Sequence, residues 1–234
     1  MKFKNITFLG TSHIAAQSLK EVRNHIEEIQ PEVIAIELDR KRLPALMSKE
    51  QKKISIKAIK YIGVKGYLFS LIGAWAEKKL GKLVGVSPGS EMKEAIQIAR
   101  EKGIELALVD QDIEITLRRL SKAITWREKM NFLTDLIKGL FNKKAEIEFD
   151  LRTVPNKNII KKMVGKLKKR YPNFYNVLID ERNKVIANNL EKLISSNHEK
   201  KILVILGAGH VDDVIEILKK REKSSISYSF SVGN

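Results

Sequence analysis

Two histidines stand in matching contexts near the two ends of this 234-residue chain. Each ends a Gly-x-x-His segment that follows an apolar run and precedes a helical pattern: GTSH at 10–13 and GAGH at 207–210. Neutral imidazole is the commonest metal ligand in proteins, and a helix N-terminus disfavours the imidazolium form. Since ligands of open α/β sheets bind at the carboxyl ends of strands, we expect His13 and His210 to share one site. Either histidine alone could instead make only a cap or loop hydrogen bond.

Acidic residues follow a second apolar run, at 33–36. Glu37 and Asp39 would leave the sheet at the same edge as His13 if their strands are parallel. They could supply a metal ligand, a general base or both, or act only in helix-start electrostatics. Arg42 could pair with Asp39 or polarise a substrate carbonyl.

Four further charged residues stand near predicted element ends or on an apolar helix face. Asp110 and Asp112 follow the apolar run 104–109. They too could act in the site or have only a structural role, and Asp112 could simply cap the next helix. Glu91 lies in the first turn of a predicted helix, where the helix dipole alone could explain it. Arg182 falls on the apolar face of the predicted helix 174–194. An unpaired guanidinium there is expensive, so Arg182 either extends to the rim or enters the site.

Periodicity and breaker residues predict an α/β protein. Its expected class is a mixed, mainly parallel central sheet flanked by helices, with a large helical insertion before the last core strands. We treat residues 1–234 as one domain, with a core at about 1–115 and 200–234 and the insertion at about 116–199. The predicted strands are 6–9, 33–36, 104–109, 202–206 and an edge strand at 226–230; the predicted helices include 15–29, 43–47, one from Ser87-Pro88 to Gly103, most of 113–197 and 211–221.

Composition narrows the functions that the chain can have. It has no cysteine, which excludes disulfides, thiolate metal sites and a cysteine nucleophile. Its formal charge is +16, but the lysines are spread through every predicted helix, so nucleic-acid binding is not favoured. The N-terminus has too short an apolar run for a secretory signal, and we expect a cytoplasmic protein. The apolar stretch 61–76 is shorter than the roughly 20 residues of a membrane span. It could be buried, form a homodimer interface, or lie on a membrane surface.

The motifs together resemble the TraB/PrgY family, which is grouped with the Tiki metalloproteases and with ChaN and erythromycin-esterase-like proteins. The blocks that carry the resemblance are GTSH at 10–13, ELDRKR at 37–42, PGSEM at 88–92, VDQDI at 109–113, DER at 180–182 and GAGHVDD at 207–213. The resemblance implies a mixed sheet with the paired Gly-x-x-His motifs at a shared active site. Tiki relatives are metal-dependent peptidases, and PrgY restrains a peptide pheromone. Many members continue into C-terminal membrane spans, so we expect this chain, which stops at Asn234, to be a soluble short form or a shortened chain.

Transferred position by position, the resemblance indicates six functional candidates: His13, Glu37, Arg42, Glu91, Arg182 and His210. The resulting hypothesis is a metal-dependent hydrolase of peptide or amide bonds. His13, His210 and Glu37 would hold a divalent ion, which could be manganese, zinc, cobalt or iron. Glu37 or Glu91 would act as the base for a metal-bound water, and Arg42 and Arg182 would stabilise the oxyanion. The alternatives are a non-catalytic peptide- or partner-binding protein and a binder of anions.

Overall fold

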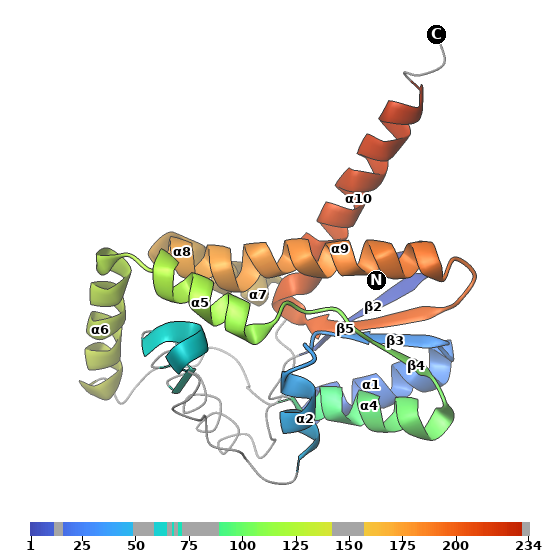
Figure 1. Ribbon diagram of the computed structural model, residues 1–234, viewed down its shortest axis with the longest axis horizontal. Helices are drawn as coiled ribbons and strands as arrows, with labels where there is room; N and C mark the ends of the chain where they lie inside the picture. The colour runs from blue at the N-terminus through green and yellow to red at the C-terminus, as the bar shows by residue number, and fades with distance from the viewer. Residues whose placement is uncertain are drawn as a thin grey trace.

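The computed structural model describes residues 1–11, 16–48, 59–64, 67, 70–71, 89–141 and 157–230 (Figure 1). Its elements form a mixed α/β fold with helices on both faces of a five-stranded sheet. In chain order they are β1 (Lys2–Phe3), β2 (Ile6–Thr11), α1 (Ala16–Ile29), β3 (Val33–Ile36), α2 (Arg42–Met47), α4 (Ser90–Lys102), β4 (Glu105–Leu108), α5 (Ile113–Ala123), α6 (Trp126–Phe141), α7 (Lys157–Arg170), α8 (Pro172–Tyr175), the π-helical turn η2 (Asn176–Asp180), α9 (Glu181–Ser196), β5 (Ile202–Gly207) and α10 (Ala208–Phe230).

The sheet has the strand order β1-β2-β5-β3-β4, so the last strand of the sequence lies at its centre. β5 pairs in parallel with both β2 and β3, and β3 pairs in parallel with β4. All six residues of β5 are buried, which is expected of a parallel strand with both faces covered. The carboxyl ends of β2, β5 and β3 therefore lie side by side.

Alternate residues of β5 pack into two separate cores. On one face, Leu203 and Ile205 contact buried residues of α1 and α4, such as Val22 and Ala95. Figure 1 shows these two helices together below the sheet. α4 ends at Gly103, whose left-handed φ of 68° suits a residue without a side chain. Every second residue of a strand and every third or fourth residue of a helix faces this core. Each fully buried Ile or Leu contributes about 1.5–3 kcal/mol to the free energy of unfolding.

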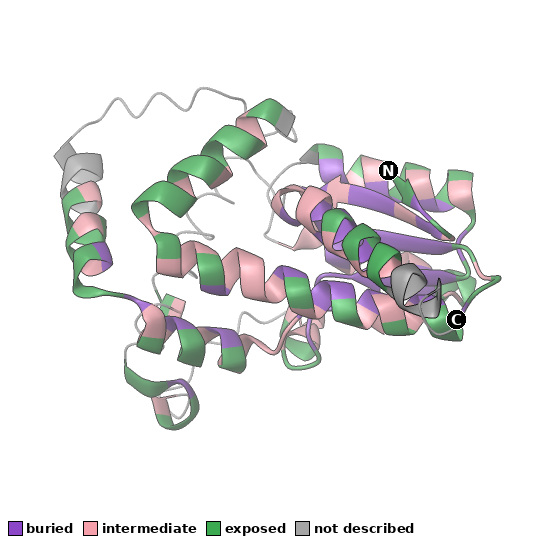
Figure 2. Cartoon of the chain, turned by 90° about the horizontal axis from the view of Figure 1, so that it is seen from above, coloured by how far each residue is buried: buried purple, intermediate pink, exposed green. Residues whose placement is uncertain are grey.

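The opposite face of the sheet is covered by α9 and by the first half of α10 (Figure 1). Ile202, Val204 and Leu206 pack there against buried residues of these helices, among them Leu190 and Val214. Figure 2 shows the burial concentrated in the strands, whereas residues 219–224 of α10 are exposed or half-buried. This arrangement fixes the starts of α9 and α10 relative to the carboxyl edge of the sheet.

Every described element between β4 and β5 is helical, as the sequence pattern predicts. Helix α6 starts with a capping box, in which Thr125 and Glu128 exchange hydrogen bonds between side chain and backbone. Glu128 also accepts a hydrogen bond from the backbone N–H of Asn173 at 2.8 Å, which joins the start of α6 to α8. Among the described residues, no helix is long and apolar enough to cross a membrane.

Three expectations from the sequence need correction or fall outside the description. The alternating segment 226–230 is not an edge strand, because α10 continues through it to Phe230. Helix α4 begins at Ser90 after a left-handed Gly89, and the predicted start at Ser87-Pro88 lies outside the described residues. Most of the apolar stretch 61–76 also lies outside them, so its predicted role as a dimer interface stays a prediction.

Candidate functional site

Glu37 is the first residue after β3 and is 3% exposed. Its backbone N–H still donates to the carbonyl of Ile205 at 3.1 Å, so the residue remains aligned with the central strand. Its side chain turns to the end of that strand, where Oε2 accepts a hydrogen bond from the backbone N–H of Gly207 at 2.6 Å. The carboxylate is therefore held at the carboxyl edge of the sheet, beside the second Gly-x-x-His segment.

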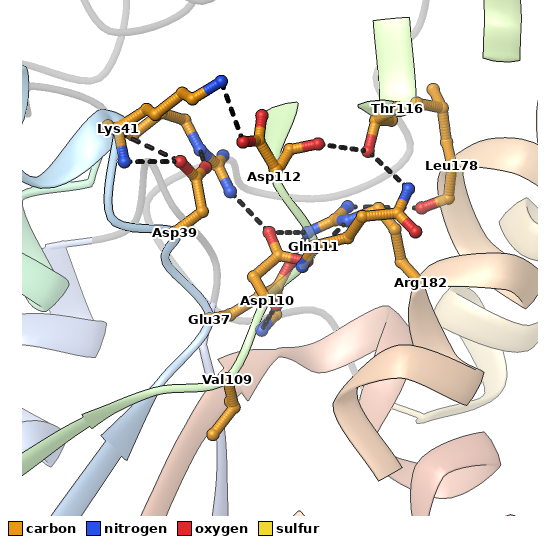
Figure 3. A network of polar contacts seen from close by, with 12 residues as sticks. Glu37, Asp39, Lys41, Val109, Asp110, Gln111, Asp112, Thr116, Leu178 and Arg182 are labelled. Atoms are coloured by element: carbon orange, nitrogen blue, oxygen red, sulfur yellow. Dashed lines mark hydrogen bonds and ion pairs between the residues drawn. The ribbon is translucent and has the colours of Figure 1, made fainter. Parts of the chain in front are cut away.

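Arg182, in the first turn of α9, supplies the positive charge next to Glu37 (Figure 3). Its Nη2 donates to Glu37 Oε1 and, at 2.8 Å, to Asp110 Oδ2. Its Nε donates to Asp110 Oδ1 at 3.0 Å, and its Nη1 donates to the carbonyl of Leu178 in the π-helical turn at 3.2 Å. The remaining contact, from Nη1 to His210 Nε2, is 3.5 Å. Four of the five N–H groups of the guanidinium thus donate to oxygen atoms of the protein, and the fifth faces the imidazole of His210.

Burial alone would lower the pKa of Arg182, but the charges of Glu37 and Asp110 outweigh it and raise the pKa above its usual value. The guanidinium therefore stays charged. The side chain of Arg182 is only 15% exposed, and both carboxylates are buried almost completely. Arg182 does not extend to the rim, which was one of the two possibilities that the sequence left open; it lies inside the polar cluster.

Arg42 lies on the outer side of the same cluster. It pairs with Asp39, which is one of the two roles considered for it from the sequence, and also with Asp110, so that Asp110 contacts both arginines. The backbone N–H of Gln111 donates to Asp110 Oδ1 at 2.7 Å. At 36%, the side chain of Arg42 is clearly more exposed than Arg182. Of the two arginines that contact Asp110, Arg42 is therefore the one that faces solvent.

His210, in the first turn of α10, contacts the same carboxylate oxygen of Glu37 as Arg182. Its Nε2 lies 3.4 Å from Glu37 Oε1, and its Nδ1 lies 2.6 Å from Asn183 Oδ1. Asn183 also contacts Asp213. Burial and the charge of Glu216 raise the pKa of Asp213 above its usual value, whereas the nearby His210 lowers it. Sequence reasoning missed the roles of Asn183 and Asp213, although each stands in or next to a block that it had singled out.

The first Gly-x-x-His segment is described only in part. Its strand is adjacent and parallel to β5, with Thr11 in register with Gly207. This placement meets the requirement that the two strands be neighbours, but His13 lies outside the described residues, and the predicted contact between the imidazoles stays a prediction. Glu91 is 1% exposed in the first turn of α4. Asp112 caps α5 by accepting a hydrogen bond from the backbone N–H of Glu114, which is the structural role considered for it above.

The described side chains do not fit a divalent ion in this arrangement. The 3.4 Å between Glu37 Oε1 and His210 Nε2 would suit two ligands of one ion. However, the guanidinium of Arg182 contacts both atoms and carries a permanent positive charge where the ion would lie. Within the described part of the chain, no group of three His, Asp or Glu side chains is placed to hold a metal. The third predicted ligand, His13, is not among those residues.

Comparison with known proteins places these residues in a family. The model of the TraB/PrgY/gumN family matches residues 2–225. This chain belongs to the TraB/PrgY/gumN family. The family resemblance of the sequence blocks is thereby confirmed, and four of the six candidates named from it are described in direct contact or one contact apart: Glu37, Arg42, Arg182 and His210.

Relatives in the TraB/PrgY/gumN family occur in archaea and animals. The chain is 37% identical over 223 residues to an uncharacterized protein of Methanocaldococcus jannaschii, covering 94% of this chain and 55% of the relative. It is 25% identical over 230 residues to a TraB domain-containing protein of Bos taurus, covering 88% of this chain and 60% of that protein. The chain therefore spans between half and two thirds of the length of these relatives.

Among solved structures, the chain is similar to a mutant of the erythromycin esterase EreC in its open conformation. The TM-score is 0.35 at 13% identity, with 87% of this chain and 60% of that chain covered. At this level the similarity carries no argument about the site.

Proposed function

We propose that this member of the TraB/PrgY/gumN family is a hydrolase that cleaves an amide or ester bond, with a peptide as its substrate. The observation that carries the proposal is the meeting of a carboxylate, a guanidinium and an imidazole at the carboxyl edge of the sheet. Glu37, Arg182 and His210 come from three separate elements and are in mutual contact. Buried charges are expensive to assemble, and perturbed titratable groups gathered at such an edge are typical of functional sites.

In this proposal His210 is the group that moves a proton. Its Nε2 takes a proton from the attacking water, whose oxygen bonds to the acyl carbon, and then returns the proton to the leaving amine or alkoxide. Glu37, 3.4 Å from that nitrogen, stabilises the imidazolium while the proton is held. The backbone N–H of Gly207 and the guanidinium of Arg182 hold the carboxylate in place.

The two arginines take different parts in this scheme. Arg182 donates four hydrogen bonds to Glu37, Asp110 and the carbonyl of Leu178, so it supports the charges of Glu37 and Asp110 rather than the substrate. Arg42 donates through Nε and Nη2 and is partly exposed. We assign to Arg42 the stabilisation of the developing oxyanion, which the sequence had assigned to both arginines.

The test is hydrolysis of chromogenic peptide anilides and nitrophenyl esters by the wild type, His210→Ala and Glu37→Gln, with Arg119→Ala as a control outside the cluster. We expect His210→Ala to lower kcat by roughly 10²–10⁴-fold and Arg119→Ala to have no effect. Equal activity in all four proteins would reject the proposal. Binding of peptide without turnover, unaffected by both substitutions, would favour a peptide-binding protein instead.

The metal-dependent form of this hydrolase, predicted from the sequence, is tested in the same assay with a chelator. Activity that survives chelation supports the scheme above, in which Arg182 carries the positive charge. Activity that is lost and then restored by manganese, zinc, cobalt or iron supports an ion held with His13. In that case Arg182 must leave its contacts with Glu37 Oε1 and His210 Nε2.

A further inference from the structure

The imidazole of His210 is held from its far side by a residue of another helix. Its Nδ1 lies 2.6 Å from Oδ1 of Asn183, which belongs to the first turn of α9. Both side chains are buried, with exposures of 6% for His210 and 1% for Asn183. A contact of this length between buried polar atoms must be a hydrogen bond, and one of the two atoms must donate.

The direction of this hydrogen bond follows from a third residue. Asn183 Nδ2 donates to Oδ2 of Asp213 at 3.3 Å. Asp213 lies three residues after His210, on the same side of α10 one turn further along. At a pH above its raised pKa, Asp213 is ionised and can only accept, so the amide nitrogen of Asn183 must face Asp213 and its oxygen must face the imidazole. An amide oxygen can only accept, and His210 Nδ1 must therefore carry the hydrogen.

We propose that Asp213, acting through Asn183, holds His210 as the Nδ1–H tautomer and so leaves its Nε2, which lies 3.4 Å from Glu37 Oε1 and 3.5 Å from Arg182 Nη1, unprotonated. Both are positioning residues, since neither contacts the reacting atoms. Their importance for catalysis rests on the proposed function, but the tautomer is a property of the folded protein whether or not it hydrolyses anything. Two consecutive residues of α9 thereby hold two side chains of the site: Arg182 contacts Glu37, and Asn183 contacts His210.

The chain of contacts depends on how α9 and α10 lie relative to each other. Arg182 and Asn183 are consecutive and point to different partners, and the π-helical turn before them ends at Asp180. Such turns within α-helices are frequent at functional sites. A displacement of α9 would break the support of the carboxylate and of the imidazole together.

The tautomer is measured directly by long-range proton–nitrogen NMR correlations of the imidazole rings in labelled protein, at a pH where His210 is neutral. The chain has four histidines, so the His210 signals are assigned by their loss in His210→Ala. In the wild type we expect a pyrrole-type nitrogen at Nδ1 and a pyridine-type nitrogen at Nε2. The Nε2–H tautomer in the wild type would overturn the proposal, without any variant.

Three variants test the chain of contacts. Asn183→Leu removes the acceptor, and Asp213→Asn lets the Asn183 amide turn over; both should shift His210 toward the Nε2–H tautomer or a mixture. Glu216→Gln removes the same charge from the exposed side of α10 and should leave the tautomer unchanged. If Asn183→Leu fails to fold, Asp213→Asn decides alone. A wild-type tautomer in Asp213→Asn would overturn the role of Asp213.

Activity provides a second readout, which separates this proposal from the proposed function. Loss of the orienting partner of a catalytic or metal-binding histidine costs roughly 10- to 100-fold. We expect Asp213→Asn to lower kcat by that factor with little change in KM. If the wild type has no hydrolase activity, the proposed function fails, whereas the NMR result still supports or overturns the tautomer.

Discussion

Two buried carboxylates of this chain, Glu128 and Glu37, are held in opposite ways. Glu128 is 3% exposed at the start of α6 and accepts hydrogen bonds only from neutral groups. Its donors are the backbone N–H and hydroxyl of Thr125, the backbone N–H and side-chain amide of Asn173, and the backbone N–H of Phe174. These contacts need no second charge and join α6 to α8.

Glu37, equally buried, has charged or titratable neighbours instead. One backbone N–H, from Gly207, is joined by the guanidinium of Arg182 and the imidazole of His210. A structural link can be made with neutral donors alone, as Glu128 demonstrates. Glu37 therefore has more charged neighbours than a structural link between elements needs. We attribute these additional charges to function.

The largest expected effect comes from removing the guanidinium between Glu37 and Asp110. Arg182→Met would leave both carboxylates buried without their cation, and we expect a loss of about 3–5 kcal/mol of unfolding free energy. Arg182→Lys keeps a charge but cannot reproduce the planar contacts, so it should lose less. Urea unfolding of both variants measures the effect. A loss below about 1 kcal/mol in Arg182→Met would show that the cluster is not held by this arginine.

Breaking the other carboxylate should cost stability without affecting chemistry. Glu128→Ala leaves the backbone N–H groups of Thr125 and Asn173 without their acceptor, which costs about 1–3 kcal/mol. The same variant should hydrolyse any substrate of the wild type at an unchanged rate below its melting temperature. A fall in kcat comparable to that of Glu37→Gln would contradict the division between the two carboxylates.

Acid should weaken the Glu128 link in a predictable direction. Burial alone would raise the pKa of Glu128, but hydrogen bonds from Thr125 and Asn173 outweigh it and lower the pKa below 4.5. A carboxyl with a lowered pKa in the folded state stabilises the protein above its unfolded pKa, and this contribution is lost as the pH falls through the folded value. Glu128→Gln should therefore lose less stability than the wild type as the pH falls from neutral to below 4.5. Parallel stability–pH curves would contradict this account.

The smallest effect is expected from an exposed ion pair. Arg119 contacts both carboxylate oxygens of Glu181 but is 56% exposed, and solvent screens the pair. Arg119→Ala should change the unfolding free energy by about 0–1 kcal/mol. Measured beside Arg182→Met, it separates the effect of burial from that of the arginine itself. If Arg119→Ala lost as much unfolding free energy as Arg182→Met, the burial of Arg182 would not explain its effect on stability.

The sequence predicts the sheet and most of its edge, because both depend on local patterns. Continuous apolar runs identify four of the strands, and residues that follow a strand must leave at its carboxyl end. This reasoning places Glu37 and His210 at the same edge of the sheet. The antiparallel strand β1 was missed, since two residues carry no periodicity. The segment 226–230 alternates like a strand but extends α10, because the preceding helix continues through it.

The partners within the site were harder to predict, because they depend on how separate elements pack. The sequence marked Arg182 by its place on an apolar face but could not choose between the rim and the interior; its two carboxylate partners decide that. Asn183 was missed because a buried amide has no sequence signature. Only the distance of three residues between His210 and Asp213 on one helix was a visible signal.

A small detail of β2 has a consequence for the imidazole at the far end of the chain. Gly10 lies against the beginning of α10, where a methyl group on it would be 3.3 Å from both the Cα of Ala208 and a side-chain methyl of Val211. Any larger residue at position 10 would push the helix start outward by a few tenths of an ångström. Gly10, the first glycine of one Gly-x-x-His segment, thus allows the close approach of the helix start that carries His210, the histidine of the other segment.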